Sequence, residues 1–336
     1  MYDPLVTLFK RIEESGGFVN AHCHLDRAYT LTKVDVEQGM IYAPLEKKWL
    51  LVDALKTELS EDDYEERMKF AIKKQKEMGV STCLSFIDID PVVGMKAINA
   101  AVKVKAYAKE ELELDLLLAS QTLKGVNNAD SKKLLEKALQ DQMLDVIGSL
   151  PRADRDVNRH FDTIFSMARE ANLPVHSHVD QNNTPTEKET ELLINKVREF
   201  SYFGKTTAVH SISLATQKRG YRKMVYSMAK DVGLNFVSCP TAWIDHKRNE
   251  LMMPFHNALT PVDELLEHDL VVAVGTDNIN DVYKPFCNGD MKVELRLLLE
   301  GNKIYDSNKL FDIATRNGLL CCGGGTFQKP SLRLLY

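Results

Sequence analysis

Eight short apolar runs, separated by longer stretches with helical periodicity, constrain the fold of this chain more than any other feature. The runs lie at 18–21, 82–87, 114–120, 146–150, 173–178, 206–210, 235–239 and 271–275. Near-continuous apolar strands that alternate with helices are typical of a parallel sheet covered on both faces. We therefore predict an α/β fold in which eight strands close into a (β/α)8 TIM-type barrel.

The segments between the runs favour this barrel over an open, doubly wound sheet. Helical patterns cover 65–80, 94–111 and 159–173, and Gly79 ends the first of them as a C-terminal cap. No G-x-G-x-x-G or Walker phosphate loop follows any strand, which weakens the nucleotide-binding alternative. We predict one domain over 1–336, with the barrel at about 18–320.

Composition narrows the class of protein. The chain has 336 residues, 44% of them hydrophobic and 27% charged, and its net charge is −5. Nucleic-acid binding usually needs a basic surface, and no apolar stretch approaches the ~20 residues of a membrane span. Six scattered cysteines without a C-x-x-C pair indicate neither a disulfide framework nor a zinc knuckle. We expect a cytoplasmic protein with a small-molecule substrate and no nucleic-acid or membrane partner.

Polar residues follow the apolar runs where a barrel places its active site, at the carboxyl ends of the strands. In chain order they are His22, His24, Asp88, Gln121, Pro151, Arg152, His176, His178, Asp180, Gln181, His210, Trp243 and Asp277. Five of the nine histidines of the chain fall in this set. A purely structural use of histidine would scatter them, so the clustering points to a functional site.

His22 and His24 are separated by one residue at the end of a predicted strand, so both side chains point to the same face. For this pair alone, an ordinary half-buried strand remains the alternative. Three imidazoles and one carboxylate together suit a divalent ion such as Zn²⁺, Fe²⁺, Co²⁺ or Mn²⁺. Such an ion lowers the pKa of a bound water, and an aspartate can accept the proton. The pattern therefore predicts metal-assisted hydrolysis.

Six segments resemble the amidohydrolase superfamily, most closely its cytosine deaminase branch. They are "AHCHLDRAYTL", "ASQTLKGV", "DVIGSLP", "HVDQ", "GLNFVSCPTAWI" and "GTDNINDVYKPF", in the order in which that branch carries its motifs. The similarity covers about 18–320. It implies a metal-dependent hydrolase that deaminates a small N-heterocyclic substrate with metal-bound hydroxide, breaking a C–N bond that is not a peptide bond.

The resemblance also implies roles for single residues. It identifies His22, His24, His178 and Asp277 as ligands of one divalent ion, zinc or iron. Asp277 would also accept a proton, and His210 would polarise water or substrate. Gln121 would bind the amide edge of the substrate.

Other strand-end residues have weaker assignments. Asp88 and Asp281 would contact the substrate or be solvated at the rim, and Trp243 would stack on a ring or pack in its loop. His176 lies deeper than His178 and is either near the metal or a packed core residue. Asp26 follows the branch motif and is expected to be structural.

The chain departs from the branch at Gln181, where the deaminases carry a glutamate that moves a proton. An amide cannot do this, and its loss typically costs ~10²–10⁴-fold in rate. Three alternatives stay open: amide, ring-opening or dehalogenating hydrolysis, rescue by a glutamate at 187, 189 or 191, and a catalytically silent ligand-binding barrel.

A second departure concerns the ends of the chain. Members of this branch usually carry a small β-sandwich built from both termini, which we expect to be absent or vestigial here. A homo-oligomer that covers a bare barrel is a further expectation.

Overall fold

The computed structural model describes residues 3–40, 43, 45–242, 250, 254–255 and 257–324. Its strands coincide with the eight predicted runs: β1 (Phe18–Cys23), β2 (Val80–Asp88), β3 (Asp115–Gln121), β4 (Ile147–Ser149), β5 (Val175–Val179), β6 (Thr206–His210), β7 (Asn235–Ser238) and β8 (Val272–Val274). The helices are α1 (Pro4–Glu14), α2 (Lys33–Glu37), α3 (Leu45–Glu58), α4 (Glu61–Glu77), α5 (Lys96–Leu112), α6 (Ala129–Gln140), α7 (Val157–Ala171), α8 (Glu189–Glu199), α9 (Arg219–Val232), α10 (Val262–Glu267), α11 (Met291–Gly301), α12 (Ser307–Ala314) and α13 (Arg316–Leu319).

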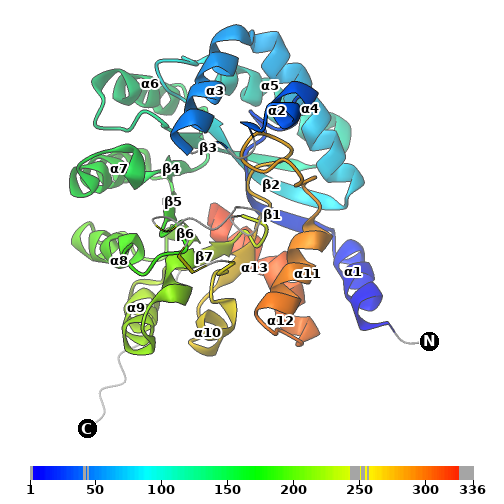
Figure 1. Ribbon diagram of the computed structural model, residues 1–336, viewed down its shortest axis with the longest axis vertical. Coiled ribbons are helices and arrows are strands. Elements are labelled where there is room, and N and C mark those ends of the chain that lie inside the picture. The colour runs from blue at the N-terminus through cyan, green and yellow to red at the C-terminus, as the bar shows by residue number, and fades with distance from the viewer. Residues whose placement is uncertain are drawn as a thin grey trace.

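All strand pairs are parallel and follow the order of the chain. β1, β2 and β3 form one sheet, and β4 to β8 form a second. Single parallel bridges connect the two sheets on both sides, between Ala119 and Val146 and between Cys23 and Asp277. Helices surround the strands (Figure 1). The predicted α/β fold with parallel strands is confirmed.

The strands are apolar along their whole length because both of their faces are covered. All six residues of β1 are buried. A large apolar cluster lies between strands and helices, with Phe18 and Ile87 among its members. A second, smaller cluster contains Val19, Phe86 and Cys321. Neighbouring residues of one strand thus belong to different cores, as the alternation of side chains along a strand requires.

The predicted helix at 65–80 shows how local sequence sets its ends. Ser60 caps α4 by accepting a hydrogen bond from the backbone N–H of Asp63, whose carboxylate accepts one from Ser60 in return. Gly79 follows the helix with φ +87°, a conformation that glycine adopts without strain. The pattern at 94–111 corresponds to α5, and that at 159–173 to α7.

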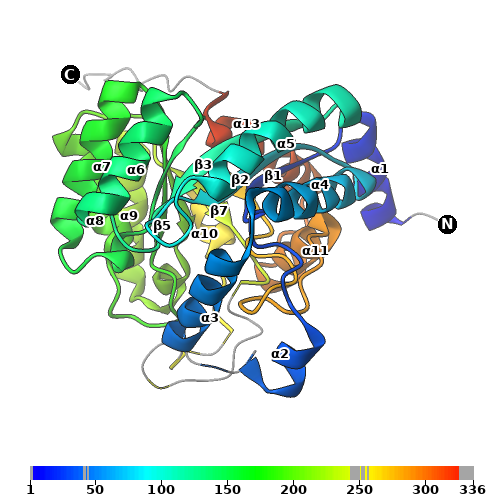
Figure 2. The same ribbon diagram turned by 90° about the horizontal axis from the view of Figure 1, so that it is seen from above.

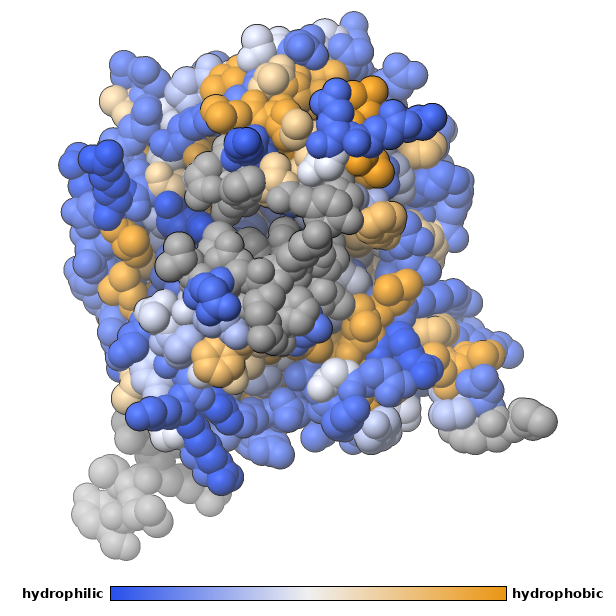
Figure 3. Space-filling view, viewed as in Figure 1, coloured by the Kyte–Doolittle hydropathy of each residue, from blue (hydrophilic) through white to orange (hydrophobic). Residues whose placement is uncertain are grey.

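The connection between β1 and β2 is unusually long and contains α2, α3 and α4. Figure 2 shows α2 and α3 extending to one side of the strands. Apolar side chains gather on the surface over these two helices (Figure 3), where Val34 is 55% and Leu50 is 67% exposed. In the described part of the chain, no helix combines the length and the apolar character that a membrane crossing needs.

Two glycines allow strands to approach closely. A Cβ atom on Gly275 would lie 2.6 Å from the backbone oxygen of His22, and one on Gly148 would overlap the backbone oxygen of Ser120. Gly275 therefore brings the end of β8 against β1, which places Asp277 beside the histidines. The backbone N–H of Asp277 donates to the oxygen of His22 at 2.9 Å.

Candidate active site

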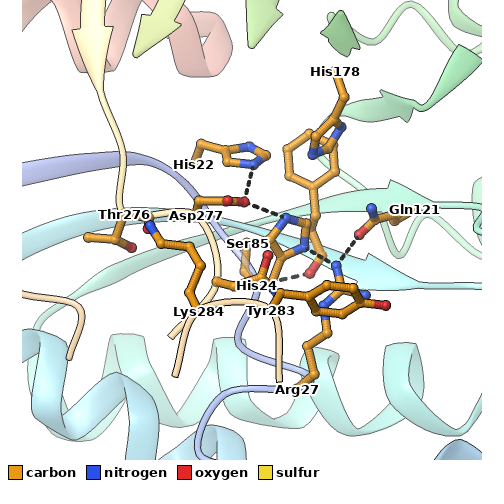
Figure 4. Close-up of polar contacts among 12 residues, drawn as sticks. His22, His24, Arg27, Ser85, Gln121, His178, Thr276, Asp277, Tyr283 and Lys284 are labelled. Atoms are coloured by element: carbon orange, nitrogen blue, oxygen red, sulfur yellow. Dashed lines mark hydrogen bonds and ion pairs between the residues drawn. The ribbon is translucent and has the colours of Figure 1, made fainter. Parts of the chain in front are cut away.

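Four histidines and one aspartate from four different strand ends meet in one buried cluster. His22 and His24 come from β1, His178 from β5, His210 from β6 and Asp277 from the segment after β8. The possible ligand atoms of His22, His24 and Asp277 all lie within 4.8 Å of one another, and the same holds for His22, His178 and His210. Figure 4 shows His22, His24 and His178 arranged around Asp277. The sequence-predicted ligands are thus brought together.

One carboxylate oxygen connects the two β1 histidines. Asp277 Oδ1 lies 3.4 Å from Nε2 of His22 and 3.2 Å from Nε2 of His24 (Figure 4). Nδ1 of His22 is buried without a hydrogen-bond partner, and its buried Nε2 has no partner other than this carboxylate. Such unpaired buried nitrogens are costly unless another group, such as a cation, uses them.

Neighbouring groups set the tautomers of two histidines. Nδ1 of His178 lies 3.3 Å from the backbone oxygen of Ser149 and donates to it, which leaves the lone pair of Nε2 for the cluster. The Arg27 guanidinium donates to Nδ1 of His24 at 2.8 Å, so the neutral ring carries its proton on Nε2, which faces Asp277 at 3.2 Å. Phe86 supports the cluster, with ring centroids 4.6 Å from His22 and 4.8 Å from His178.

Burial keeps the imidazoles neutral. It lowers the pKa of His22, of His24 and of His210 to about 4, and the pKa of His178 lies well below its ordinary value for the same reason. Burial favours protonation of Asp277, but hydrogen bonds from His22 and His24 hold its pKa well below the ordinary value. Neutral imidazoles beside an ionised carboxylate are the protonation states that metal ligands need.

The cluster therefore fits a divalent cation on three independent observations. Its nitrogen and oxygen atoms converge, its imidazoles are neutral beside an ionised carboxylate, and the nitrogens of His22 have no partner other than Asp277. His176 does not belong to the cluster, because its Nε2 interacts with the backbone oxygen of Cys321 at the opposite end of β5.

A cavity of about 90 Å³ opens onto this cluster. Its walls combine residues of this cluster with polar, charged and apolar side chains from α3, from β3 and from the loops that follow the strands. The lining residues are His24, Arg27, Trp49, Gln121, Leu123, Leu150, Arg152, His178, Gln181, His210, Asp277, Asn278, Tyr283 and Lys284. Two sequence-predicted substrate contacts, Gln121 and Gln181, are among them.

An ion-pair network holds one wall of the cavity. Arg27 donates to both carboxylate oxygens of Asp88, at 3.0 and 3.2 Å, and to Oε1 of Gln121 at 2.9 Å. Lys56 of α3 binds Asp88 at 2.8 Å and Asp90 at 2.6 Å. Burial disfavours the charge of Asp88, but Arg27 and Lys56 hold its pKa below the ordinary value. Arg27 thus orients both Gln121 and His24.

Two sequence expectations concern this region. Asp88 and Asp281 are buried, which rules out solvation at the rim, and neither is among the described lining residues of the cavity, so a substrate contact stays a prediction for both. Asp88 turns to buried cations, whereas Asp281 accepts the backbone N–H groups of Tyr283 and Lys284 at 2.8 and 2.9 Å. Asp26 accepts from the backbone N–H of Asp88 at 2.9 Å, a structural role. Trp243 lies outside the described residues.

Gln181 lies at the cavity wall, and its amide nitrogen is buried without a partner. The three nearby glutamates are engaged elsewhere. Glu187 accepts from Ser213 and Glu189 from the backbone N–H of Asp180, while Glu191 accepts from Tyr221. None of them lines the described cavity, so the structure offers no carboxylate in place of the expected glutamate.

Several cavity residues had no role in the sequence analysis: Arg27, Trp49, Arg152, Tyr283 and Lys284. Arg27, Tyr283 and Lys284 lie inside the motifs quoted above, so their proximity to metal-site residues was a usable signal. Trp49 comes from α3, far from any strand end, and the sequence carries no sign that this helix reaches the cavity.

Burial disfavours the charge of Lys284, but Cys287, Glu294 and Asp277 outweigh this effect and raise its pKa. The ammonium group donates to the backbone oxygen of Thr276 at 2.8 Å and to the hydroxyl of Thr241. The Thr241 hydroxyl in turn donates to Glu294 at 2.6 Å. Lys284 therefore ties the segment that carries Asp277 to α11.

Comparisons with curated proteins find several relatives, and no family model matches the chain. An uncharacterized protein of Haemophilus influenzae is 39% identical over 260 residues, covering 76% of this chain and 92% of that protein. The N-isopropylammelide isopropyl amidohydrolase of Pseudomonas sp. (strain ADP) is 26% identical over 282 residues, covering 82% of this chain and 66% of that enzyme.

Solved structures share the fold. A 5-methylcytosine deaminase from Klebsiella pneumoniae, liganded with 5-fluorocytosine, superposes with a TM-score of 0.83 at 22% identity, over 92% of this chain and 75% of that one. An N-isopropylammelide isopropylaminohydrolase from Burkholderia multivorans gives 0.73 at 16% identity, over 93% and 76%. This chain is thus similar in sequence to a curated amidohydrolase, and it shares the fold of solved deaminases and aminohydrolases.

Proposed function

We propose that this protein is a metal-dependent hydrolase that cleaves C–N bonds in a small N-heterocyclic compound, as the cytosine-type deaminases do. The observation that carries the proposal is the pair of ligand groups that share His22, one with His24 and Asp277 and the other with His178 and His210, beside a small cavity. The relatives support the substrate class, because their names refer to cytosine and ammelide rings.

In this proposal His22, His24, His178 and Asp277 hold one divalent ion, zinc or iron. A solved atrazine chlorohydrolase from Arthrobacter aurescens with the same fold, at a TM-score of 0.60 and 16% identity, is complexed with zinc. When bound, such an ion acts as a Lewis acid that activates water for attack on a ring carbon.

The residues of the chain supply the other parts of the reaction. Asp277 is ionised and accepts the proton of the attacking water. His210, neutral and at the cavity wall, stabilises charge that develops on the substrate. Gln121 and Gln181 bind the amide edge of the ring, one of them held by Arg27 and the other with a free amide nitrogen.

The finer architecture belongs to the same proposal. The two parallel sheets, joined by single bridges at Ala119 and at Cys23, form one closed (β/α)8 barrel. A single domain, a missing β-sandwich and a homo-oligomer remain predictions.

Metal analysis tests the ligand set. Wild-type protein should bind about one zinc or iron ion per chain, and His22→Ala should weaken metal affinity by more than roughly a hundredfold, since even groups that only support ligands contribute 10–100-fold. His268→Ala, at the end of α10 and away from the cluster, is the matched control and should bind metal normally. Unchanged metal content in His22→Ala would refute the site.

Ammonia release tests the reaction. Metal-loaded protein and Gln181→Glu are each assayed with aminated pyrimidines, pterins and triazines. Release by the wild type would establish a deaminase that tolerates glutamine at this position. If the wild type releases no ammonia and only Gln181→Glu does, the protein has the scaffold of a deaminase but performs other chemistry or none. The comparisons favour C–N hydrolysis over ring opening, dehalogenation or a silent barrel.

A further inference from the structure

Positively charged side chains outnumber negatively charged ones at the described cavity wall. Arg27, Arg152 and Lys284 are cationic, whereas Asp277 is the only carboxylate among the described lining residues. A bound divalent ion would add further positive charge. The chain as a whole is acidic, with a net charge of −5, so the cationic wall does not follow from average composition.

Two of the three cations already have carboxylate partners behind the wall. Arg27 binds Asp88 through two hydrogen bonds, and Lys284 is linked to Glu294 through the hydroxyl of Thr241. Their donors are largely used within the protein. These two residues therefore stabilise the wall more than they attract a ligand.

Arg152 is different. It lies in the single turn after β4, Pro151–Ala153, and is partly exposed to the cavity. Among the described residues, its hydrogen bond is one long contact from Nη1 to Oδ1 of Asn182, at 3.5 Å. No carboxylate in the described ranges forms an ion pair with it. Glu189 lies near enough to feel its charge, but that carboxyl group accepts the backbone N–H of Asp180.

We propose that Arg152 recognises an anionic oxygen group on the substrate, so that the natural substrate is a negatively charged N-heterocycle. This inference rests on the proposed function. A guanidinium presents several donors in a planar fork that matches a carboxylate or a deprotonated ring oxygen. Trp49, Leu123 and Leu150 line the same cavity, and they offer apolar surfaces for the ring that carries this group.

Binding of product-like rings to zinc-loaded protein, measured by isothermal titration calorimetry, tests the inference. One arm compares uracil-5-carboxylate with uracil-5-carboxamide, which has a similar shape and no charge. The other arm compares barbiturate, anionic through its ring oxygens, with uracil. Each pair is titrated into the wild type, Arg152→Gln, Arg152→Lys and Arg155→Gln. Arg155 is the matched control, because it is an exposed arginine three residues away and does not line the cavity.

In the wild type, we expect the anion of at least one pair to bind roughly tenfold or more tightly than its neutral partner, with the preference falling as salt rises. Arg152→Gln should reduce this ratio to about one, Arg152→Lys should restore part of it, and Arg155→Gln should leave it unchanged. A preference in the first pair would identify a carboxylate as the recognised group. A preference in the second pair would identify a deprotonated ring oxygen. Thermal unfolding and zinc content of Arg152→Gln should match the wild type, since its contact is weak.

Equal binding of charged and neutral rings, no binding of either anion, or a preference that survives in Arg152→Gln would each overturn the inference. Release of ammonia from anionic rings at the same rate in Arg152→Gln as in the wild type would also overturn it, while leaving the proposed hydrolase standing. A wrong assignment of the metal site would show separately, because His22→Ala would then have normal metal content.

Discussion

The two sides of the cavity differ in how their polar groups are satisfied. On the side of β1, β2 and β8, buried charges are paired across elements: Arg27 with Asp88, and Asp88 with Lys56. On the side of β4 and β5, Arg152 makes one long hydrogen bond and the amide nitrogen of Gln181 makes none.

This difference separates side chains that the protein holds in one geometry from donors that remain available to a ligand. Satisfied networks fix side chains in one geometry, and the paired side carries the residues that orient His24, Asp277 and Gln121. Unsatisfied donors at a cavity wall are available to a ligand, and leaving them unused costs less where water reaches them. The β4–β5 side is therefore the one that we propose for substrate recognition, and it is called the recognition side below.

The largest expected effect follows from breaking the paired side. Asp88→Asn leaves the buried Arg27 guanidinium without its carboxylate, and we expect it to lower the free energy of unfolding by roughly 3 kcal/mol or more. Asp269→Asn is the matched control, since Asp269 pairs with Lys230 on the exposed surface and should change stability much less. Urea unfolding measures both. Similar small losses in the two variants would contradict the distinction between the two sides.

A smaller effect is expected where β8 approaches β1. Gly275→Ala places a Cβ atom 2.6 Å from the oxygen of His22, and overpacking of this kind costs about 1–3 kcal/mol. Metal affinity should fall as well, because Asp277 moves away from the histidines. Gly220→Ala in α9 has no atom within 4 Å of the added methyl and should be neutral or slightly stabilising. Calorimetric unfolding and zinc titration distinguish these outcomes.

The smallest effect concerns pH and the recognition side. Burial, reinforced by Asp180 and Glu187, raises the pKa of Glu189 to about 8. Between about 4.5 and about 8 the folded protein keeps a proton that the unfolded chain releases, so stability falls as pH rises through this window and then levels. The pKa of Asp180, raised by burial to about 6, acts in the same direction.

We expect the melting temperature of the wild type to decline across this range and that of Glu189→Gln to decline less, because glutamine keeps an acceptor for the backbone N–H of Asp180. Glu267→Gln, an exposed position in α10, is the control and should follow the wild type. If the melting temperatures of the wild type and Glu189→Gln decline in parallel with pH, Glu189 is not the source of the pH dependence.

The residues that sequence reasoning located best are those whose position follows from strand periodicity. His22, His24 and His178 end apolar runs, and parallel strands bring their carboxyl ends to one edge. The backbone at two of the predicted positions was not visible in the sequence: His210 and Asp277 have φ of 76° and 59°, a left-handed conformation that is uncommon outside glycine.

The amino-acid sequence by itself determined the eight strands, their parallel order and the cluster of histidines, since these depend on local patterns that repeat along the chain. Only the tertiary structure decided that Asp88 pairs with Lys56 of α3, and that Trp49 of the same helix lines the cavity. The reason is physical. A buried charge takes whichever opposite charge the fold brings within reach, and the paths of loops and of the long β1–β2 connection follow from packing rather than from periodicity.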